Sequence, residues 1–270
     1  MPDSKLIEIE GADGVETWLM NAAPVNALSP ELLDAFDGAL DRLQRNKDTS
    51  VVVLTSGLRV FSAGADASWM AKVVAEDGVD GLLEQFNVTM DRFRSVCIRI
   101  RQSPVLFVAA INGHALAGGL ELAVACDLRF ATDGEKVQFG VPEMSLFGAM
   151  PSGGGGVQYL ARLMGSSTAL KFVLDAEPVG PEVALGLGLV DWLLPAESVL
   201  SDTVDWARGV ASKAGPVGVA AAKRSIIGGA ELPFYEAMEF DRALHWDAMR
   251  RGNFTEGVAA FVEKFGGSAT

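Results

Sequence analysis

The spacing of apolar positions predicts alternating strands and helices along the first two thirds of the chain. The short β-branched or apolar runs at residues 51–55 (VVVLT) and 105–111 are typical of strands buried in an α/β sheet. Before the first of these runs, Ser29 and Pro30 fit the N-cap and first position of a helix whose apolar residues recur at helical spacing. A second amphipathic helix is predicted over residues 84–101.

The order of strand, turn and helix recurs further along the chain. Residues 105–125 (VLFVAAINGHALAGGLELAVA) are followed by residues 127–144 and then by a helix from Val157. Beyond Pro195 the chain becomes helical and richer in charge, with helices expected over residues 234–251 and 255–265. This alternation predicts an α/β fold with a helical C-terminal region.

Composition narrows the classes of function. A net charge of −13 disfavours a nucleic-acid or anionic-membrane surface, and no apolar run approaches the roughly 20 residues that span a bilayer. The N-terminus lacks the pattern of a secretory signal, so we expect a cytoplasmic protein. The chain has only two histidines, and its cysteines at 97 and 126 form no CxxC pattern, so we expect no metal. Serine hydrolase, P-loop and dinucleotide-binding motifs are not found in the sequence.

Three glycine-containing segments carry the candidate chemistry. In residues 112–127 (NGHALAGGLELAVACD), Gly118 and Gly119 open a predicted helix, whose first N–H groups have no partner within the helix and favour an oxyanion. In residues 61–70 (FSAGADASWM), the small residues at Gly64 and Ala65 let the backbone approach a ligand and offer a second N–H. Two such donors would flank a thioester oxygen and stabilise an enolate.

Two glutamates supply the proton chemistry. Glu121 lies in the second segment and Glu143 in the third, residues 137–156 (VQFGVPEMSLFGAMPSGGGG). If both face one apolar pocket, burial and repulsion raise at least one pKa, so that one carboxyl holds a proton while the other accepts one. This division suits the addition of water to a double bond conjugated to a thioester, and a single such glutamate would instead move a proton between carbons.

These segments closely resemble the crotonase superfamily, the enoyl-CoA hydratases and isomerases. The resemblance runs from APVNALSPELL near the N-terminus to EGVAAFVEKF near the C-terminus. It implies a spiral of repeated ββα turns over residues 1–195, which holds the acyl-CoA site. It also implies that residues 196–270 form a helical region that builds a homotrimer, often doubled to a hexamer.

The resemblance also implies roles for individual residues. The oxyanion donors are the backbone N–H groups of Ala65 and Gly118, and the catalytic acids are Glu121 and Glu143. Coenzyme A enters as part of the substrate, and no separate cofactor is implied. The residues expected to contact substrate or CoA are Ala63, Asp66, Ala67, Ser68, Phe261 and Lys264.

Some positions depart from the family pattern or admit plainer interpretations. Ser68 stands where related hydratases have a lysine near CoA, and Ser152 follows Pro151 where they have a glycine. Arg59, Lys72 and Lys264 are candidates for the CoA phosphates. Asp66 is expected to fix its own turn and His114 to be a packing residue, while Glu121 and Glu143 can also be read as a helix first-turn acid and a solvated loop carboxylate.

Three functions remain open from the sequence. A 2-enoyl-CoA hydratase fits the paired glutamates, and a Δ3,Δ2-enoyl-CoA isomerase is the alternative, because APVNALS looks more like some isomerases. A non-catalytic acyl-CoA binder is the third hypothesis. The presence of both glutamates disfavours it, because a binder has no use for two carboxylates. The acyl pocket is expected to be formed by Trp69, Met70, Leu116 and a loop over residues 72–86.

Overall fold

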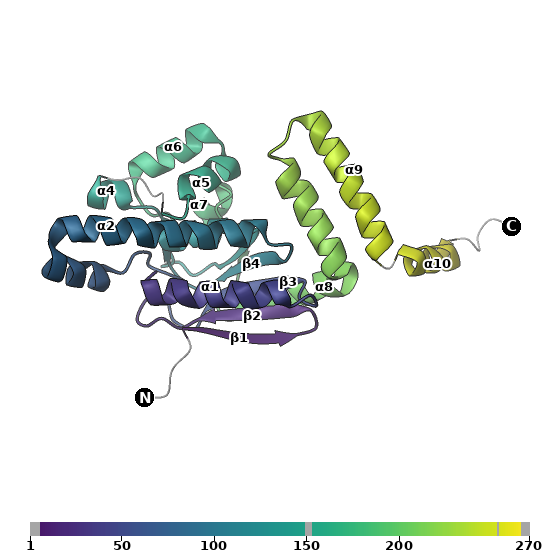
Figure 1. The fold of residues 1–270 in the computed structure, drawn as a ribbon, viewed down its shortest axis with the longest axis horizontal. Coiled ribbons are helices and arrows are strands. Elements are labelled where there is room, and N and C mark those ends of the chain that lie inside the picture. Colours follow the sequence, from purple (N-terminus) through teal and green to yellow (C-terminus); the bar gives the residue numbers. More distant parts are fainter. Residues whose placement is uncertain (1–5, 149–152, 253, 266–270) are drawn as a thin grey trace.

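A six-stranded, mostly parallel sheet forms the centre of the molecule in the computed structural model, which describes residues 6–148, 153–252 and 254–265. The spatial order is β1-β2-β3-β4-β6-β8, with β1 antiparallel to β2 and the remaining pairs parallel (Figure 1). The strands are β1 (Ile7–Ala12), β2 (Val15–Met20), β3 (Val51–Ser56), β4 (Leu106–Ile111), β6 (Leu128–Thr132) and β8 (Trp192–Leu194). The α/β class and the strands predicted at residues 51–55 and 105–111 are confirmed.

A second, smaller set of strand pairs runs beside the main sheet. It contains β5 (Ala115–Leu116) and β7 (Phe139–Gly140), extended by single bridges from Leu28 to Ala65, from Ser62 to Ala115 and from Phe139 to Val179. Each of the strands β2, β3, β4 and β6 is therefore followed by a short extended segment and then a helix. This succession is the ββα turn expected from the sequence, and it brings the loops after successive strands side by side.

Helices cover both faces of the sheet. On one face, α1 (Pro30–Arg45), α2 (Ala67–Gln102) and α3 (Gly118–Ala125) share one core with Val52 and Leu54 of β3. On the other face, α8 (Val199–Lys223) packs on Val51 and Val53 of the same strand. The shorter helices are α4 (Glu143–Phe147), α5 (Gly156–Met164), α6 (Ser166–Asp175) and α7 (Pro181–Gly186). Side chains alternate between faces along a strand, so the apolar run of β3 serves both cores.

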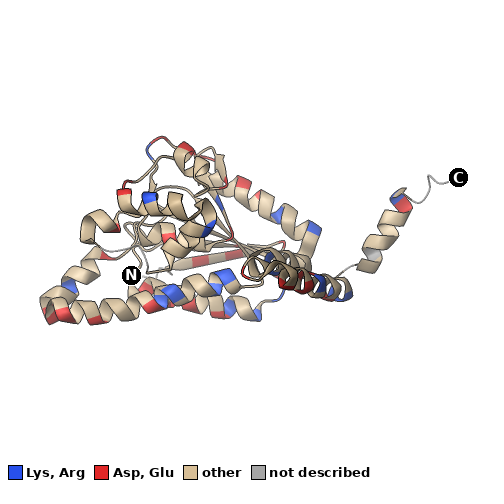
Figure 2. Ribbon diagram, turned by 90° about the horizontal axis from the view of Figure 1, so that it is seen from above, with Lys and Arg blue, Asp and Glu red and all other residues tan. Residues whose placement is uncertain are grey.

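The helix α1 begins as its sequence predicts. The Oγ of Ser29 accepts a hydrogen bond from the N–H of Leu32 at 3.2 Å, and Pro30 occupies the first helical position. Acidic and basic residues are interspersed along the helices (Figure 2), and Arg99 of α2 pairs with Asp37 of α1 at 2.8 Å.

The long helix α2 differs from the prediction. A helix was expected only from residue 84, with a loop over residues 72–86, but the helix begins at Ala67 and includes that stretch. Its start is fixed by Asp66, whose Oδ1 accepts from the N–H groups of Ser68 and Trp69, both at 2.9 Å. The helical backbone is interrupted at one position, Gly78, where a φ of 73° produces a kink. The prediction of a loop was wrong because the N-cap and one glycine turn suffice to continue the helix.

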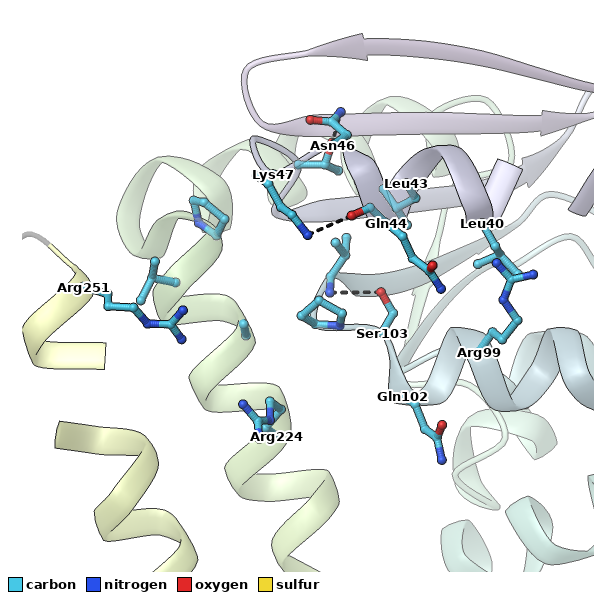
Figure 3. A pocket seen from close by; sticks show the side chains of 16 residues that line it. Leu40, Leu43, Gln44, Asn46, Lys47, Arg99, Gln102, Ser103, Arg224 and Arg251 are labelled. Atoms are coloured by element: carbon cyan, nitrogen blue, oxygen red, sulfur yellow. Dashed lines mark hydrogen bonds between the residues drawn. The ribbon is translucent and has the colours of Figure 1, made fainter. Parts of the chain in front are cut away.

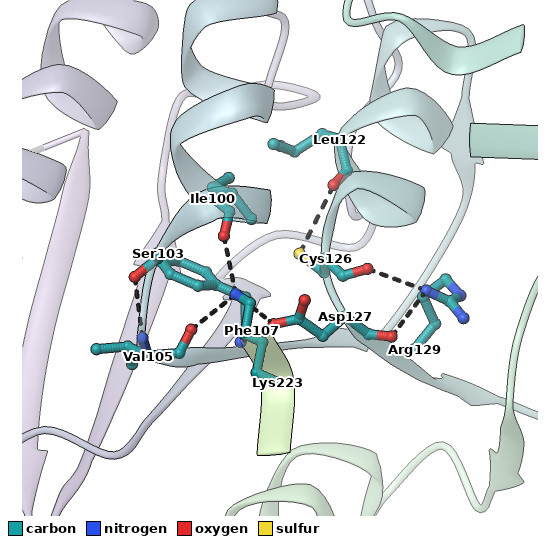
Figure 4. A network of polar contacts seen from close by, with 9 residues as sticks. All are labelled: Ile100, Ser103, Val105, Phe107, Leu122, Cys126, Asp127, Arg129 and Lys223. Atoms are coloured by element: carbon teal, nitrogen blue, oxygen red, sulfur yellow. Dashed lines mark hydrogen bonds and ion pairs between the residues drawn. The ribbon is translucent and has the colours of Figure 1, made fainter. Parts of the chain in front are cut away.

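A buried ion pair anchors the end of α8 in the core (Figure 4). The Nζ of Lys223 lies 2.7 Å from Oδ2 of Asp127, and both side chains are almost fully buried. Lys223 also donates to the carbonyl oxygens of Ile100 and Val105 at 3.0 and 2.9 Å. Burial lowers the pKa of Lys223 and raises that of Asp127, while their mutual attraction opposes both shifts. The pair joins α8, the end of α2 and the start of β6.

The C-terminal arm consists of η1 (Arg224–Gly228), α9 (Phe234–Arg251) and α10 (Phe254–Phe265), and it extends away from the sheet (Figure 1). The helix predicted over residues 234–251 is confirmed, and the last helix starts one residue earlier than expected. Large apolar side chains are exposed along the arm, including Ile226 (73%), Phe234 (74%), Tyr235 (82%), Met238, Trp246, Phe254, Phe261 and Val262. No helix in the described part of the chain is long and apolar enough to cross a membrane.

Candidate active site

Two backbone loops meet at the edge of the sheet where β3 and β4 end. The N–H groups of Phe61 and Ser62 donate to the carbonyl of His114 at 2.9 and 3.2 Å, and the N–H of Leu116 donates to the carbonyl of Ser62 at 3.0 Å. The approach is closest at glycines. A Cβ on Gly119 would lie 2.3 Å from the carbonyl oxygen of Ser62, and one on Gly64 would lie 2.9 Å from the nitrogen of Gly118. Only glycine permits this contact between backbones.

Ala65 and Gly118 hold the two predicted N–H donors at this contact. Neither N–H donates a hydrogen bond to another residue in the described ranges. Gly118 opens α3, and Ala117 before it has a φ of 52°, so the chain turns sharply into the helix. Gly64, which precedes Ala65, also has a positive φ of 88°. The two turns thus bring the segments that carry these amides into contact, and among the described residues neither amide has a hydrogen-bond acceptor.

Glu121 lies in the first turn of α3 and is 3% exposed. Its Oε1 accepts hydrogen bonds from the N–H groups of Gly154 and Gly156 at 3.1 and 2.6 Å. Burial raises the pKa of this carboxyl, and the glycine N–H groups oppose the shift. The helix predicted from Val157 is confirmed as α5, which starts one residue earlier, at Gly156, and Gly156 is buried against Glu121.

Glu143 starts the short helix α4 and is only partly buried. Its Oε2 is buried and has no hydrogen-bond partner among the described residues. Burial raises the pKa of Glu143 to about 7, and the charge of Glu121 contributes to the increase. An acid with this pKa exists in both protonation states near neutral pH, as general acid–base chemistry requires.

The remaining predicted residues fall into two groups. Asp66 caps α2 as expected, and Ala63, Ala67 and Ser68 are exposed beside it, as are Arg59 and Lys72. Phe261 and Lys264 lie on α10, which both views show far from α4 and the start of α2 within this chain (Figures 1 and 2). Ser152 and Pro151 lie outside the described residues.

His114 is partly exposed at the end of the turn after β4. Its Nδ1 accepts from the N–H of Gln138 at 3.2 Å, which joins the second loop to the segment before β7. In the part of the chain that the structure describes, no group of three or more His, Cys, Asp or Glu side chains could hold a metal ion.

The sequence pattern did not indicate two further residues at this site. Asn26 and Ser62 are both fully buried and hydrogen-bond to the first loop. Asn26 belongs to the APVNALS segment, where the resemblance had only suggested a family subtype. In the sequence, each is a single polar residue within a short run of small and apolar residues. Such a polar residue, once buried, needs hydrogen-bond partners, and this was the only sign of its role.

A large groove of about 860 Å³ lies elsewhere, between the ends of α1 and α2 and the helix α8 (Figure 3). Its polar side chains include Lys47, Arg99, Arg224 and Arg251, and none of its lining residues is acidic. It therefore offers no proton acceptor of the kind found at Glu121 and Glu143. A second groove of about 730 Å³ lies between α2, α5 and the C-terminal arm, with Gly154 and Gly155 in its wall.

The chain is similar to known proteins over almost its whole length. A family described as enoyl-CoA hydratase/isomerase matches residues 12–267. A probable mitochondrial enoyl-CoA hydratase of Dictyostelium discoideum is 35% identical over 95% of this chain and 87% of its own length. The short-chain-enoyl-CoA hydratase of Clostridium acetobutylicum is 30% identical over 96% of this chain and 94% of its own. The crystal structure of an enoyl-CoA hydratase from Bacillus anthracis superposes with a TM-score of 0.86 at 29% identity, covering 96% of each chain.

Proposed function

Because this chain belongs to the enoyl-CoA hydratase/isomerase family, a crotonase-type α/β fold, we propose that it adds water across the 2,3 double bond of a 2-enoyl-CoA thioester. Two features carry this proposal. The backbone N–H groups of Ala65 and Gly118 donate to no other described residue, and burial raises the pKa of the carboxyls of Glu121 and Glu143. The protein is then a hydro-lyase whose substrate brings its own coenzyme A, and no separate cofactor is needed.

The unpaired amides polarise the thioester. As water adds to the β-carbon, negative charge moves to the thioester oxygen, which accepts hydrogen bonds from the N–H groups of Ala65 and Gly118. Each such donor contributes roughly 3–4 kcal/mol to stabilising the developing enolate. The donors belong to the backbone, so their geometry depends on the contact between the loops and not on a side-chain rotamer.

The glutamates divide the proton transfers. Glu121 accepts a proton from the attacking water as the new C–O bond forms at the β-carbon. Glu143, protonated at the start, donates its proton to the α-carbon as the enolate collapses. One molecule of water is thereby added, and exchange of the proton between Glu121 and solvent, and between solvent and Glu143, restores the starting state. The pKa of about 7 at Glu143 lets it serve as this acid at neutral pH.

The positions expected to touch CoA are also part of the proposal. Ala63, Asp66, Ala67 and Ser68 follow the first oxyanion loop, and Arg59 and Lys72 are exposed cations on either side of them. Trp69 and Met70 at the start of α2, together with Leu116, line the acyl group. With Ser68 in place of a lysine, the CoA phosphates depend more on the flanking cations.

We further propose that the chain assembles as a homotrimer or a dimer of trimers through the helical region of residues 196–270. The large apolar side chains exposed on the C-terminal arm support this, since a monomer seldom exposes so many together. Phe261 and Lys264, remote from the site of their own chain, would then contact CoA bound to a neighbouring subunit. The cytoplasm stays the predicted location.

A substrate panel tests the proposal. Incubation with 2-enoyl-CoA thioesters of increasing chain length should remove the absorbance of the conjugated enone. An isomerase would instead generate that absorbance from a 3-enoyl-CoA, with Glu121→Gln largely tolerated. Tight binding of every thioester without turnover would identify a non-catalytic binder. Absence of hydration at all chain lengths contradicts the proposed function.

A further inference from the structure

Every polar atom of Asn26 is engaged, although the residue is fully buried and lies outside the glycine-containing segments. Its Nδ2 donates to Oγ of Ser56 at 2.7 Å and to the carbonyl of Phe61 at 3.1 Å. Its Oδ1 accepts from the N–H of Ala22 at 2.8 Å, and its own N–H donates to the Ala22 carbonyl at 2.7 Å. The φ of 47° is left-handed, a conformation that Asn tolerates better than most residues. Asn26 is thus fixed on all sides.

Ser62 connects Asn26 to both oxyanion loops. Its Oγ donates to the carbonyl of Asn26 at 2.8 Å and accepts from the N–H of Gly64 at 3.2 Å. Its carbonyl accepts from the N–H of Leu116 at 3.0 Å and lies against Gly119 of the second loop. One buried serine therefore contacts Gly64, which precedes Ala65, and also Leu116 and Gly119, which lie before and after Gly118 in the second loop.

Backbone pairing on both sides of Asn26 completes the connection. The N–H of Ala63 donates to the carbonyl of Val25 at 3.1 Å, and the N–H of Leu28 donates to the carbonyl of Gly64 at 2.8 Å. The segments around residues 26 and 62 are thus held together by alternating backbone and side-chain hydrogen bonds. A shift of Asn26 would move the whole first loop.

We propose that Asn26 and Ser62 are positioning residues that set the mutual placement of the Ala65 and Gly118 N–H groups. This inference rests on the proposed function, because it concerns the oxyanion donors of that reaction. Neither side chain needs to reach the substrate. Their effect is on geometry, and a displacement of about 1 Å at such a site costs on the order of 100-fold in rate.

The test uses Asn26→Asp and Ser62→Ala in the full-length protein. Asp keeps the acceptor for Ala22 and the tolerance for a positive φ, but it places an oxygen where Nδ2 donated to Phe61. Ser62→Ala removes the hydroxyl link and nothing else, so it serves if the first variant folds poorly. The control is Asn46→Ala. The Nδ2 of Asn46 donates to Glu16 and Thr49 and its Oδ1 accepts from the N–H of Asp48, so it makes the same kinds of side-chain hydrogen bond as Asn26 but away from the two loops.

Three readouts separate positioning from general loss of structure. The first is kcat for hydration, expected to fall about 10- to 100-fold in both variants. The second is the absorption band of bound cinnamoyl-CoA, which moves to longer wavelength when its carbonyl is polarised and should move less in both variants. The third is the Kd for butanoyl-CoA, a saturated thioester that develops no enolate charge, which should change less than about threefold. Asn46→Ala should match the wild type in all three.

A full spectral shift with kcat near that of the wild type in both folded variants would overturn the positioning role. Equal losses in butanoyl-CoA binding and kcat would also overturn it, because they indicate general disruption of the site. If the wild type itself neither hydrates enoyl-CoA nor shifts the band, the proposed function fails, and this inference fails with it.

Discussion

The N–H of Gly156 donates to Oε1 of Glu121 at 2.6 Å, and a Cβ at residue 156 would fall 2.6 Å from that same oxygen. Oε1 of Glu121 is therefore both the hydrogen-bond acceptor for residue 156 and the atom that a side chain at residue 156 would clash with. The start of α5 thereby fixes the position of a carboxylate that comes from the first turn of α3. A buried carboxylate held by backbone N–H groups keeps one orientation, which suits a group that must hold a water molecule.

Replacing Gly156 by alanine should therefore damage the site. The added methyl group would lie 2.5 Å from Cγ of Glu121, so either the carboxylate or α5 must move. We expect kcat for hydration to fall by at least about 10-fold and stability to fall by about 1–3 kcal/mol. The matched control is Gly209→Ala in α8, where a Cβ would meet nothing within 4 Å and should stabilise the helix by about 0.5–1 kcal/mol. Unchanged kcat in Gly156→Ala would show that Glu121 does not need this support.

The raised pKa of Glu143 predicts a descending limb in the pH profile of kcat/KM. The protonated form is the acid that supplies the α-carbon, and it is lost as pH rises through about 7. The rate should therefore fall by about tenfold per pH unit well above that value and level off below it, until a second group titrates. Steady-state rates between pH 5 and 9 measure this limb. A rate that rises through pH 7 would assign Glu143 the role of base in this direction.

The buried pair of Lys223 and Asp127 should be required for stability. Lys223→Met leaves the Asp127 carboxylate buried without its cation, which costs about 3–5 kcal/mol. The double variant Lys223→Met/Asp127→Asn should recover part of this loss, since no unpaired charge remains. Arg162→Met is the control, because its partner Glu231 and Arg162 itself are about half exposed and such pairs contribute at most about 1 kcal/mol. Denaturant unfolding monitored by circular dichroism gives the comparison, and equal losses in the two single variants would refute the prediction.

The exposed apolar surface of the C-terminal arm predicts self-association. Light scattering should give three or six times the 28.5 kDa mass of one chain. Phe234→Asp/Tyr235→Asp places charges at two of the most exposed apolar positions and should reduce the measured mass. Val183→Asp on α7, at a position 52% exposed, should leave it unchanged. A wild-type mass of one chain would contradict the assembly.

Several helices and strands could be predicted from local features of the sequence. Ser29 and Pro30 marked the start of α1, the run VVVLT marked β3, and prolines and glycines bounded α9. These three elements could be predicted because each is determined by residues that are close together in the sequence and by whether that segment is buried. The glycine-containing motifs predicted the candidate site for a similar reason, because close backbone contact restricts the residue type.

Long-range pairing was beyond what the sequence pattern could indicate. Lys223 and Asp127 are far apart in the chain and each resembles an ordinary surface charge when read alone. Asn26 gave no periodic signal, and its importance depends on Ser62, which becomes its neighbour only when the second ββα turn stacks on the first. The helix over residues 72–86 was missed because many of its side chains are exposed, so no apolar stripe marks it.

The central claim is that two carboxyls share one enolate site and that both are needed for hydration. The most direct measurement is the rate at which a 2-enoyl-CoA loses its conjugated absorbance with wild type, Glu121→Gln and Glu143→Gln, each confirmed as folded. We predict turnover by the wild type and a decrease of about 10²- to 10⁴-fold in each variant. Retention of near wild-type hydration by either variant would contradict the claim.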